Sequence, residues 1–124
     1  MAVAACASLL HRSDAPGSTL LVHNAGATAV DLHVLQGISV VGDTAQYMLG
    51  TVFAGETACF RLETVGMPQW LTIKSIGGIL LTPSFYPADH PAWEIELRGD
   101  PLTDGFGLQP ADEKCQPGAR LPLR

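Results

Sequence analysis

Two histidines and an aspartate, His23, Asp31 and His33, lie in consecutive stretches that alternate apolar and polar residues. If these stretches pair as antiparallel strands with their even-numbered residues facing the core, His23 lies opposite Asp31 on the outer face, with His33 one step diagonal. Two imidazoles and a carboxylate near one another can hold Zn²⁺ or Cu²⁺. Because a stable site needs three or four converging ligands, the pattern favours a solvated polar face and leaves a transition-metal site as the alternative.

The chain contains three cysteines, Cys6, Cys59 and Cys115. Cys59 points outward from a strand whose even-numbered residues face the core, and Cys115 lies in the C-terminal stretch. In an exported protein these two could form a disulfide that pins the C-terminal stretch across a sheet face, worth about 3–4 kcal/mol in the chain-entropy model. The alternative is three unpaired thiols in a cytoplasmic protein.

Two aromatic residues, Tyr47 and Trp70, could form a surface for a ligand. Trp70 alternates with the apolar residues Leu71 and Ile73, so its side chain is expected to point outward. An outward aromatic ring can stack on a carbohydrate or another planar molecule. The alternative is that both side chains are partly buried sheet residues, as most aromatic residues are.

Residue patterns typical of catalysis are absent from the sequence. There is no Gly-x-Ser-x-Gly elbow, Walker loop, His-Glu-x-x-His helix or Cys-x-x-Cys pair. Glu94 and Glu96 share one strand face at a spacing of about 7 Å, which paired-carboxylate chemistry could use, yet outward glutamates on such a strand are usually solvated. Nothing places a histidine beside Cys59 to activate it. The sequence predicts neither an enzyme nor a cofactor.

The elements that must position these residues read as strands. Short runs with period-two alternation lie between turn-forming glycines and prolines, and no run has a helical period. The cleanest run is 92–98, where Trp93, Ile95 and Leu97 alternate with charged residues. The expected strands are 19–24, 29–35, 45–53, 57–62, 70–76, 79–82 and 92–98. About seven strands at this spacing predict an all-β, antiparallel, two-sheet sandwich over residues 18–98.

The central pair of strands is expected to form a kinked hairpin with a tight turn at 54–56. Leu49 and Val52 are an odd number of residues apart, so both can face one core only if an extra residue is absorbed between them. Gly50 is where a bulge costs least. From residue 99 to 124 the alternation stops and Pro and Gly recur, which predicts a disordered C-terminal tail.

Length and composition set further limits. The chain has 124 residues, of which 47% are hydrophobic and 15% charged, which suits one compact domain. Its net charge is −5, and the seven basic residues are scattered, so no basic patch for nucleic acid or for an anionic membrane face is expected. No apolar run reaches the roughly 18–20 residues that span a bilayer.

The N-terminal run Val-Ala-Ala-Cys at 3–6 resembles a bacterial lipobox, in which a small-residue run precedes a cysteine that is lipidated and becomes the mature N-terminus. This resemblance implies that residues 1–17 comprise a truncated lipoprotein signal and a tether, with the lipid on Cys6. It would be the protein's one link to a membrane. The alternative is a ragged terminus with a free thiol.

The order of the strands carries a second resemblance. A first strand ending in Asn24, a short strand at 30–34, Leu-Gly-Thr-Val-Phe-Ala-Gly at 49–55 followed by Phe-Arg-Leu at 60–62, and a last strand at 93–97 resemble small, uncharacterised bacterial envelope proteins and lipoproteins with an immunoglobulin-like sandwich. This likeness spans about residues 18–98. It implies the fold and an exported location, and it transfers no functional residue.

Taken together, these features predict a non-catalytic module of the bacterial cell envelope, periplasmic or lipid-anchored, with a structural role or a protein partner. A cytoplasmic location is the alternative. The competing functions are binding of a small, carbohydrate-like ligand at Tyr47 and Trp70, and binding of a transition metal at His23, Asp31 and His33.

Overall fold

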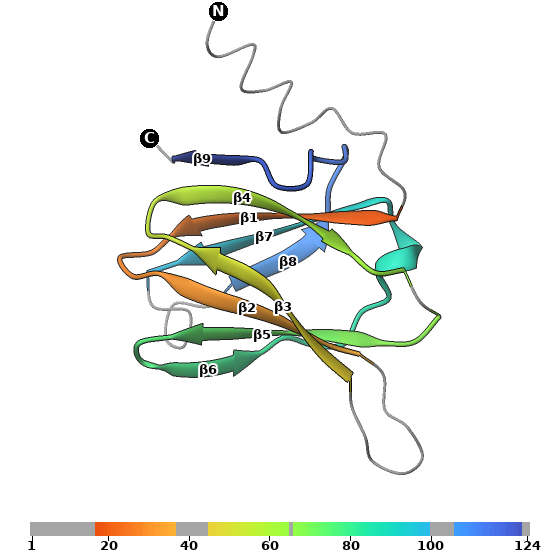
Figure 1. Cartoon of the computed structure of the whole chain (residues 1–124), viewed down its shortest axis with the longest axis horizontal. Coiled ribbons are helices and arrows are strands. Elements are labelled where there is room, and N and C mark those ends of the chain that lie inside the picture. The colour runs from red at the N-terminus through yellow and green to blue at the C-terminus, as the bar shows by residue number, and fades with distance from the viewer. Residues whose placement is uncertain (1–16, 37–44, 65, 100–105, 123–124) are drawn as a thin grey trace, which may run out of the picture.

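The computed structural model describes residues 17–36, 45–64, 66–99 and 106–122. These residues form nine strands and one short 3-10 helix, and the strands build two sheets that face each other (Figure 1). The elements are β1 (Ser18–Ala25), β2 (Val30–Gln36), β3 (Ala45–Val52), β4 (Glu56–Leu62), β5 (Gln69–Ser75), β6 (Gly78–Leu81), η1 (Pro87–Asp89), β7 (Ala92–Arg98), β8 (Phe106–Pro110) and β9 (Arg120–Pro122). The expected all-β sandwich is therefore confirmed, with nine strands in place of about seven.

The core lies between a five-stranded sheet, in the order β8-β7-β1-β4-β9, and a four-stranded sheet, in the order β3-β2-β5-β6. Alternation in the sequence determines which residues enter it: along β2, Val30, Leu32 and Val34 are buried while the intervening Asp31 and His33 stay half-exposed. The same alternation buries the apolar residues of β7. The buried core comprises Leu20, Val22, Val30, Leu32, Val34, Val52, Ala58, Leu62, Leu71, Ile73, Phe85, Trp93, Ile95 and Leu97.

The expected hairpin between β3 and β4 does not form, because the two strands belong to different sheets. The turn between them is a corner of the sandwich, in which the Glu56 amide donates to the Phe53 carbonyl at 3.0 Å and the Gly55 amide donates to the Asn24 carbonyl at 2.8 Å. Each strand buries one apolar face against the opposite sheet. Period-two alternation specifies that face but not the neighbouring strand.

The expected pairing of β1 with β2 is wrong for the same reason. The strand β1 lies in the middle of the five-stranded sheet, antiparallel to β4 and parallel to β7, so the sandwich is not purely antiparallel. The strand β2 pairs with β3 and β5 in the other sheet.

The bulge expected at Gly50 is confirmed. In the pairing of β2 with β3, Leu32 lies opposite Gly50 while His33 lies opposite Met48, so Leu49 is the extra residue. The absorbed residue allows both Leu49 and Val52 to pack against the core.

The C-terminal stretch is not the disordered tail that the sequence suggested. The strand β8 pairs with β7 at one edge of the five-stranded sheet, and β9 pairs with β4 at the other edge. Between them the chain crosses the outer face of that sheet. There the Cys59 amide donates to the Ala119 carbonyl, and the Cys59 carbonyl accepts from the Gly118 amide, each at 2.9 Å. The prolines and glycines of this stretch mark its turns, and the sandwich extends to Pro122 in place of ending at Arg98.

Candidate functional site

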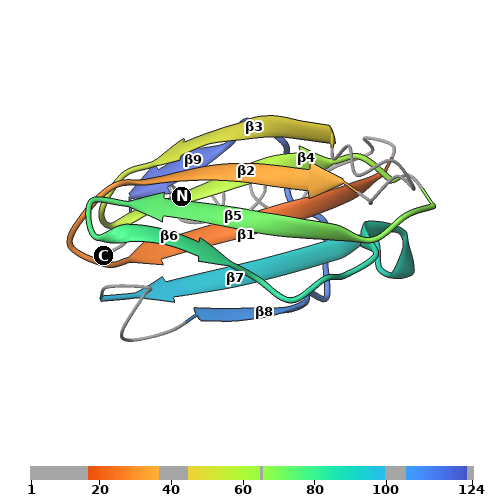
Figure 2. The same cartoon turned by 90° about the horizontal axis from the view of Figure 1, so that it is seen from below.

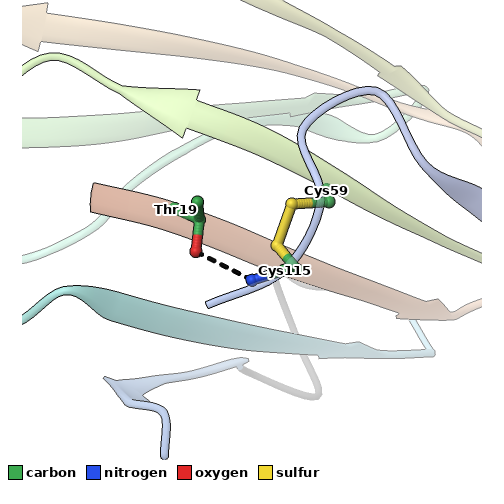
Figure 3. The surroundings of a disulfide bond; sticks show 3 residues. All are labelled: Thr19, Cys59 and Cys115. Carbon is green, nitrogen blue, oxygen red and sulfur yellow. Dashed lines mark hydrogen bonds between the residues drawn. A yellow bond between two sulfur atoms is a disulfide. The ribbon is translucent and has the colours of Figure 1, made fainter. Parts of the chain in front are cut away.

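Cys59 and Cys115 form the disulfide that the sequence predicted, with their Cα atoms 6.0 Å apart (Figure 3). Both cysteines are 1% exposed, and together with Leu21 they form a small apolar cluster on the outer face of the five-stranded sheet. The Cys115 amide donates to Thr19 Oγ1 at 3.1 Å, which fixes the crossing chain to β1 as well as to β4. A disulfide this well buried is suited to holding the fold together and poorly suited to exchange with an outside thiol.

The structure does not bring His23, Asp31 and His33 together, because β1 and β2 lie in different sheets. Asp31 accepts a hydrogen bond from the Thr51 hydroxyl on the neighbouring strand. Within the described part of the chain, no group of three or more His, Cys, Asp and Glu residues is placed to hold a metal ion. The register behind the metal-site hypothesis is therefore wrong.

His23 instead joins a different polar cluster on the five-stranded sheet. Its Nδ1 lies 3.2 Å from Thr57 Oγ1, and its Nε2 lies 3.7 Å from Glu94 Oε2. A hydroxyl, an imidazole and a carboxylate in this order are the groups of a nucleophilic triad. Thr57, however, is only 3% exposed, so its hydroxyl cannot reach a substrate. The cluster links β4, β1 and β7, which lie side by side in the sheet.

Tyr47 and Trp70 point to opposite sides of the four-stranded sheet and cannot form one stacking platform. Tyr47 is paired with the buried Val34 and packs against the core. Its hydroxyl accepts a hydrogen bond from the Glu63 amide at 3.3 Å. Burial raises the pKa of the Tyr47 hydroxyl above its ordinary value, because a phenolate would lose its hydration. Trp70 lies opposite Leu35 on the outer side.

The outer side of the four-stranded sheet is a candidate site that the sequence analysis did not predict. We call it the open face and define it by Leu35, Met48, Trp70, Ile79 and Leu81. Strand pairing aligns these side chains: one cross-strand row runs from Met48 on β3 through β2 and β5 to Leu81 on β6. Leu35 and Trp70 form a neighbouring pair on β2 and β5. Apolar side chains from all four strands thus share one surface.

None of the described residues covers the open face, whereas the outer face of the other sheet carries the C-terminal chain. Met48 is 53% exposed, Ile79 62% and Leu81 53%. Between them, in the middle of the row, lie His33 and Thr72. The Nδ1 atom of His33 is buried and has no hydrogen-bond partner among the residues that the structure describes.

The sequence did not indicate the open face, because the apolar run at 79–82 is continuous and fits either a strand covered on both sides or an edge strand. The strand order places β6 at an edge of its sheet, with the side chains of Ile79 and Leu81 exposed. Cys6, the residue of the lipidation prediction, lies outside the described residues.

Comparison with protein-family models, with curated proteins and with solved structures finds no match for the chain. None of the described residues belongs to a helix that is long and apolar enough to cross a membrane.

Proposed function

We propose that the protein is a non-catalytic, immunoglobulin-like module of the bacterial cell envelope that binds a protein partner through its open face. The single observation that carries this proposal is the exposure of Met48, Ile79 and Leu81 on a sheet face that also contains Leu35 and Trp70. Exposed apolar side chains grouped on one face of a domain commonly mark an interaction site.

The composition of the open face suits a protein partner better than a small ligand. It is a sheet surface that presents Trp70 and Met48, two residue types enriched at protein interfaces. The half-buried His33 provides one polar side chain among the apolar ones, where a hydrogen bond to a partner gives specificity. The charged pair Asp31 and Lys74 borders the row and could limit the partner's register.

The buried disulfide supports the exported location. Disulfides persist in oxidising compartments such as the bacterial periplasm and are rare in reduced cytoplasm. The immunoglobulin-like assignment is supported by the crossing of the chain from one sheet to the other at the β3–β4 corner. A lipid on Cys6 would hold the module at a membrane, and a mass spectrum of the exported chain would detect it.

Site-specific photo-crosslinking tests the proposal. A photoreactive amino acid at Met48, in bacterial cells that export the protein, is expected to crosslink a discrete partner in the envelope fraction. The same amino acid at Phe53, which is 59% exposed in the β3–β4 turn, is expected not to crosslink that partner.

A pair of matched variants completes the test. The double substitution Ile79→Lys and Leu81→Lys is expected to abolish the Met48 crosslink, because a buried interface cannot take two unpaired charges. Phe53→Lys with Met67→Lys removes two exposed apolar side chains elsewhere and adds the same charge, so it is expected to retain the crosslink. Equal crosslinking from Met48 and Phe53, or equal loss in both double variants, would contradict the proposal.

A further inference from the structure

A separate cavity of about 420 Å³ lies at the edge of the sandwich. The strands β6 and β8 are the edge strands on this side of the two sheets, and the chain after β6 passes from the four-stranded sheet towards β7 of the other sheet (Figure 2). Residues 83–85 of this crossing segment line one wall of the cavity, and residues 106–108 of β8, with Trp93 of β7, line the other. The cavity is distinct from the open face, which uses none of these residues.

The walls of this edge pocket are aromatic and held in place. Phe85 and Trp93 are each 8% exposed and meet edge to face, with ring centroids 5.0 Å apart. Two backbone hydrogen bonds of 2.8 and 2.9 Å join Phe85 to Gln69 of β5. The indole nitrogen of Trp93 donates to the Pro87 carbonyl at 3.2 Å. The ring positions are therefore fixed before any ligand arrives, which lowers the entropic cost of binding.

We propose that the edge pocket binds a small, neutral, aromatic molecule. None of its seven lining residues is charged, so an ionic ligand would lose its hydration without finding a counter-charge. The Trp93 N–H is already bonded to the chain, so that side chain presents only ring carbon. Offset and edge-to-face contacts with Phe85, Trp93 and Phe106 favour another aromatic ring over a flexible alkyl chain.

The size of the edge pocket limits the ligand. Cavities of roughly 150 Å³ hold benzene, and small-molecule sites in proteins run from about 300 to 1,000 Å³. At about 420 Å³ this one has room for about two fused rings with a small substituent. The hydroxyl of Ser84, an exposed lining residue, can hydrogen-bond that substituent.

Titration of the intact protein with 1-naphthol, a neutral two-ring probe, tests the assignment. We expect saturable binding at one molecule per chain, with a shift of the Trp93 indole N–H resonance in the NMR spectrum. Naphthalene-1-sulfonate has the same rings and a negative charge, and it is expected to bind at least tenfold more weakly. The flexible apolar probe 1-octanol is also expected to bind more weakly than 1-naphthol.

Three variants locate the bound probe. Ser84→Trp fills the edge pocket from an exposed position and is expected to weaken 1-naphthol binding at least tenfold. Ala54→Trp places the same side chain on the exposed β3–β4 turn and is expected to leave binding within twofold. Phe106→Leu keeps an apolar wall but removes a ring, and it is expected to weaken binding about threefold to tenfold, which keeps the test valid if Ser84→Trp does not fold.

The failure of this proposal can be told apart from failure of the open-face proposal. The Ile79→Lys and Leu81→Lys variant is expected to bind 1-naphthol as the unmodified protein does, although it loses the crosslink from Met48. Absence of saturable binding, binding that Phe106→Leu leaves unchanged, loss of binding in the open-face variant, or tighter binding of 1-octanol would each overturn the assignment of an aromatic-ligand site.

Discussion

Tyr47 shows how one residue read as a ligand platform becomes part of the packing. Its ring lies against the core and its hydroxyl accepts from the Glu63 amide. Because burial raises the pKa of this hydroxyl, deprotonation is easier in the unfolded chain than in the folded one. The contribution of Tyr47 to stability is therefore complete below the ordinary tyrosine pKa of about 10 and is lost as pH rises through the higher folded-state pKa.

We expect the free energy of unfolding of the intact protein to fall as the pH is raised above about 10, and Tyr47→Phe to reduce that fall. At pH 7 the free energy of unfolding of Tyr47→Phe should be about 1 kcal/mol lower than that of the unmodified protein, which is the typical contribution of one hydrogen bond. Urea denaturation across pH 7–11 measures both effects. Tyr86→Phe alters an exposed tyrosine, 45% accessible, and serves as the control. An alkaline fall that is unchanged in Tyr47→Phe and reduced in Tyr86→Phe would contradict this account.

At the level of elements, the bulge in β3 is the clearest case of a local requirement visible in the sequence. Gly50 has a φ of +152°, a conformation that side chains with a Cβ rarely adopt, and a Cβ placed there would lie 3.0 Å from Phe60 Cε1. The residue therefore allows β3 to twist closely against β4 at the corner between the sheets.

Gly50→Ala is expected to lower the free energy of unfolding by about 1–3 kcal/mol, through backbone strain and the close approach to the Phe60 ring. Gly107→Ala in β8 is the matched control, because a Cβ there has no atom within 4 Å and the φ of Gly107 is not among the positive ones. That control should be neutral or stabilising by about 0.5–1 kcal/mol. Chemical denaturation of both variants measures the difference, and equal destabilisation would exclude a special role for the bulge.

These elements also show what the sequence could and could not predict. Alternation identified β1 to β7, their buried faces, the Gly50 bulge and the outward direction of Cys59, because each depends on neighbouring residues only, whereas β8 and β9 lie where the alternation stops. Strand partners depend on contacts distant in sequence, so the sequence predicts the wrong neighbour for β1 and the wrong residue opposite His23. The open face and the edge pocket arise from that distant pairing, so no local pattern marked them.

At the scale of the whole molecule, the C-terminal chain covers the outer face and both edges of the five-stranded sheet. Its strands β8 and β9 occupy the two edges, and the segment between them covers the outer face. This arrangement protects two sheet edges that would otherwise present unpaired backbone groups. It also explains why Leu21 and Thr19, which point away from the core, are 6% and 0% exposed. The four-stranded sheet has no such cover over the described residues, and the proposed interaction surface lies there.

Two variants can separate the contribution of these strands from that of the disulfide. Cys59→Ala with Cys115→Ala removes a cross-link between residues 56 positions apart, which the chain-entropy model values at about 4 kcal/mol. Because small domains are stable by about 5–15 kcal/mol, this full-length variant is expected to remain folded and to unfold cooperatively at a lower temperature.

Truncation after Arg98 removes the same disulfide and also uncovers Leu21 and the outer edges of β4 and β7. The truncated chain is therefore expected to lose its cooperative thermal transition, monitored by circular dichroism. If it instead melts cooperatively at the temperature of the disulfide-free full chain, then β8 and β9 contribute no stability, and residues 18–98 form a complete domain as the alternation alone suggested.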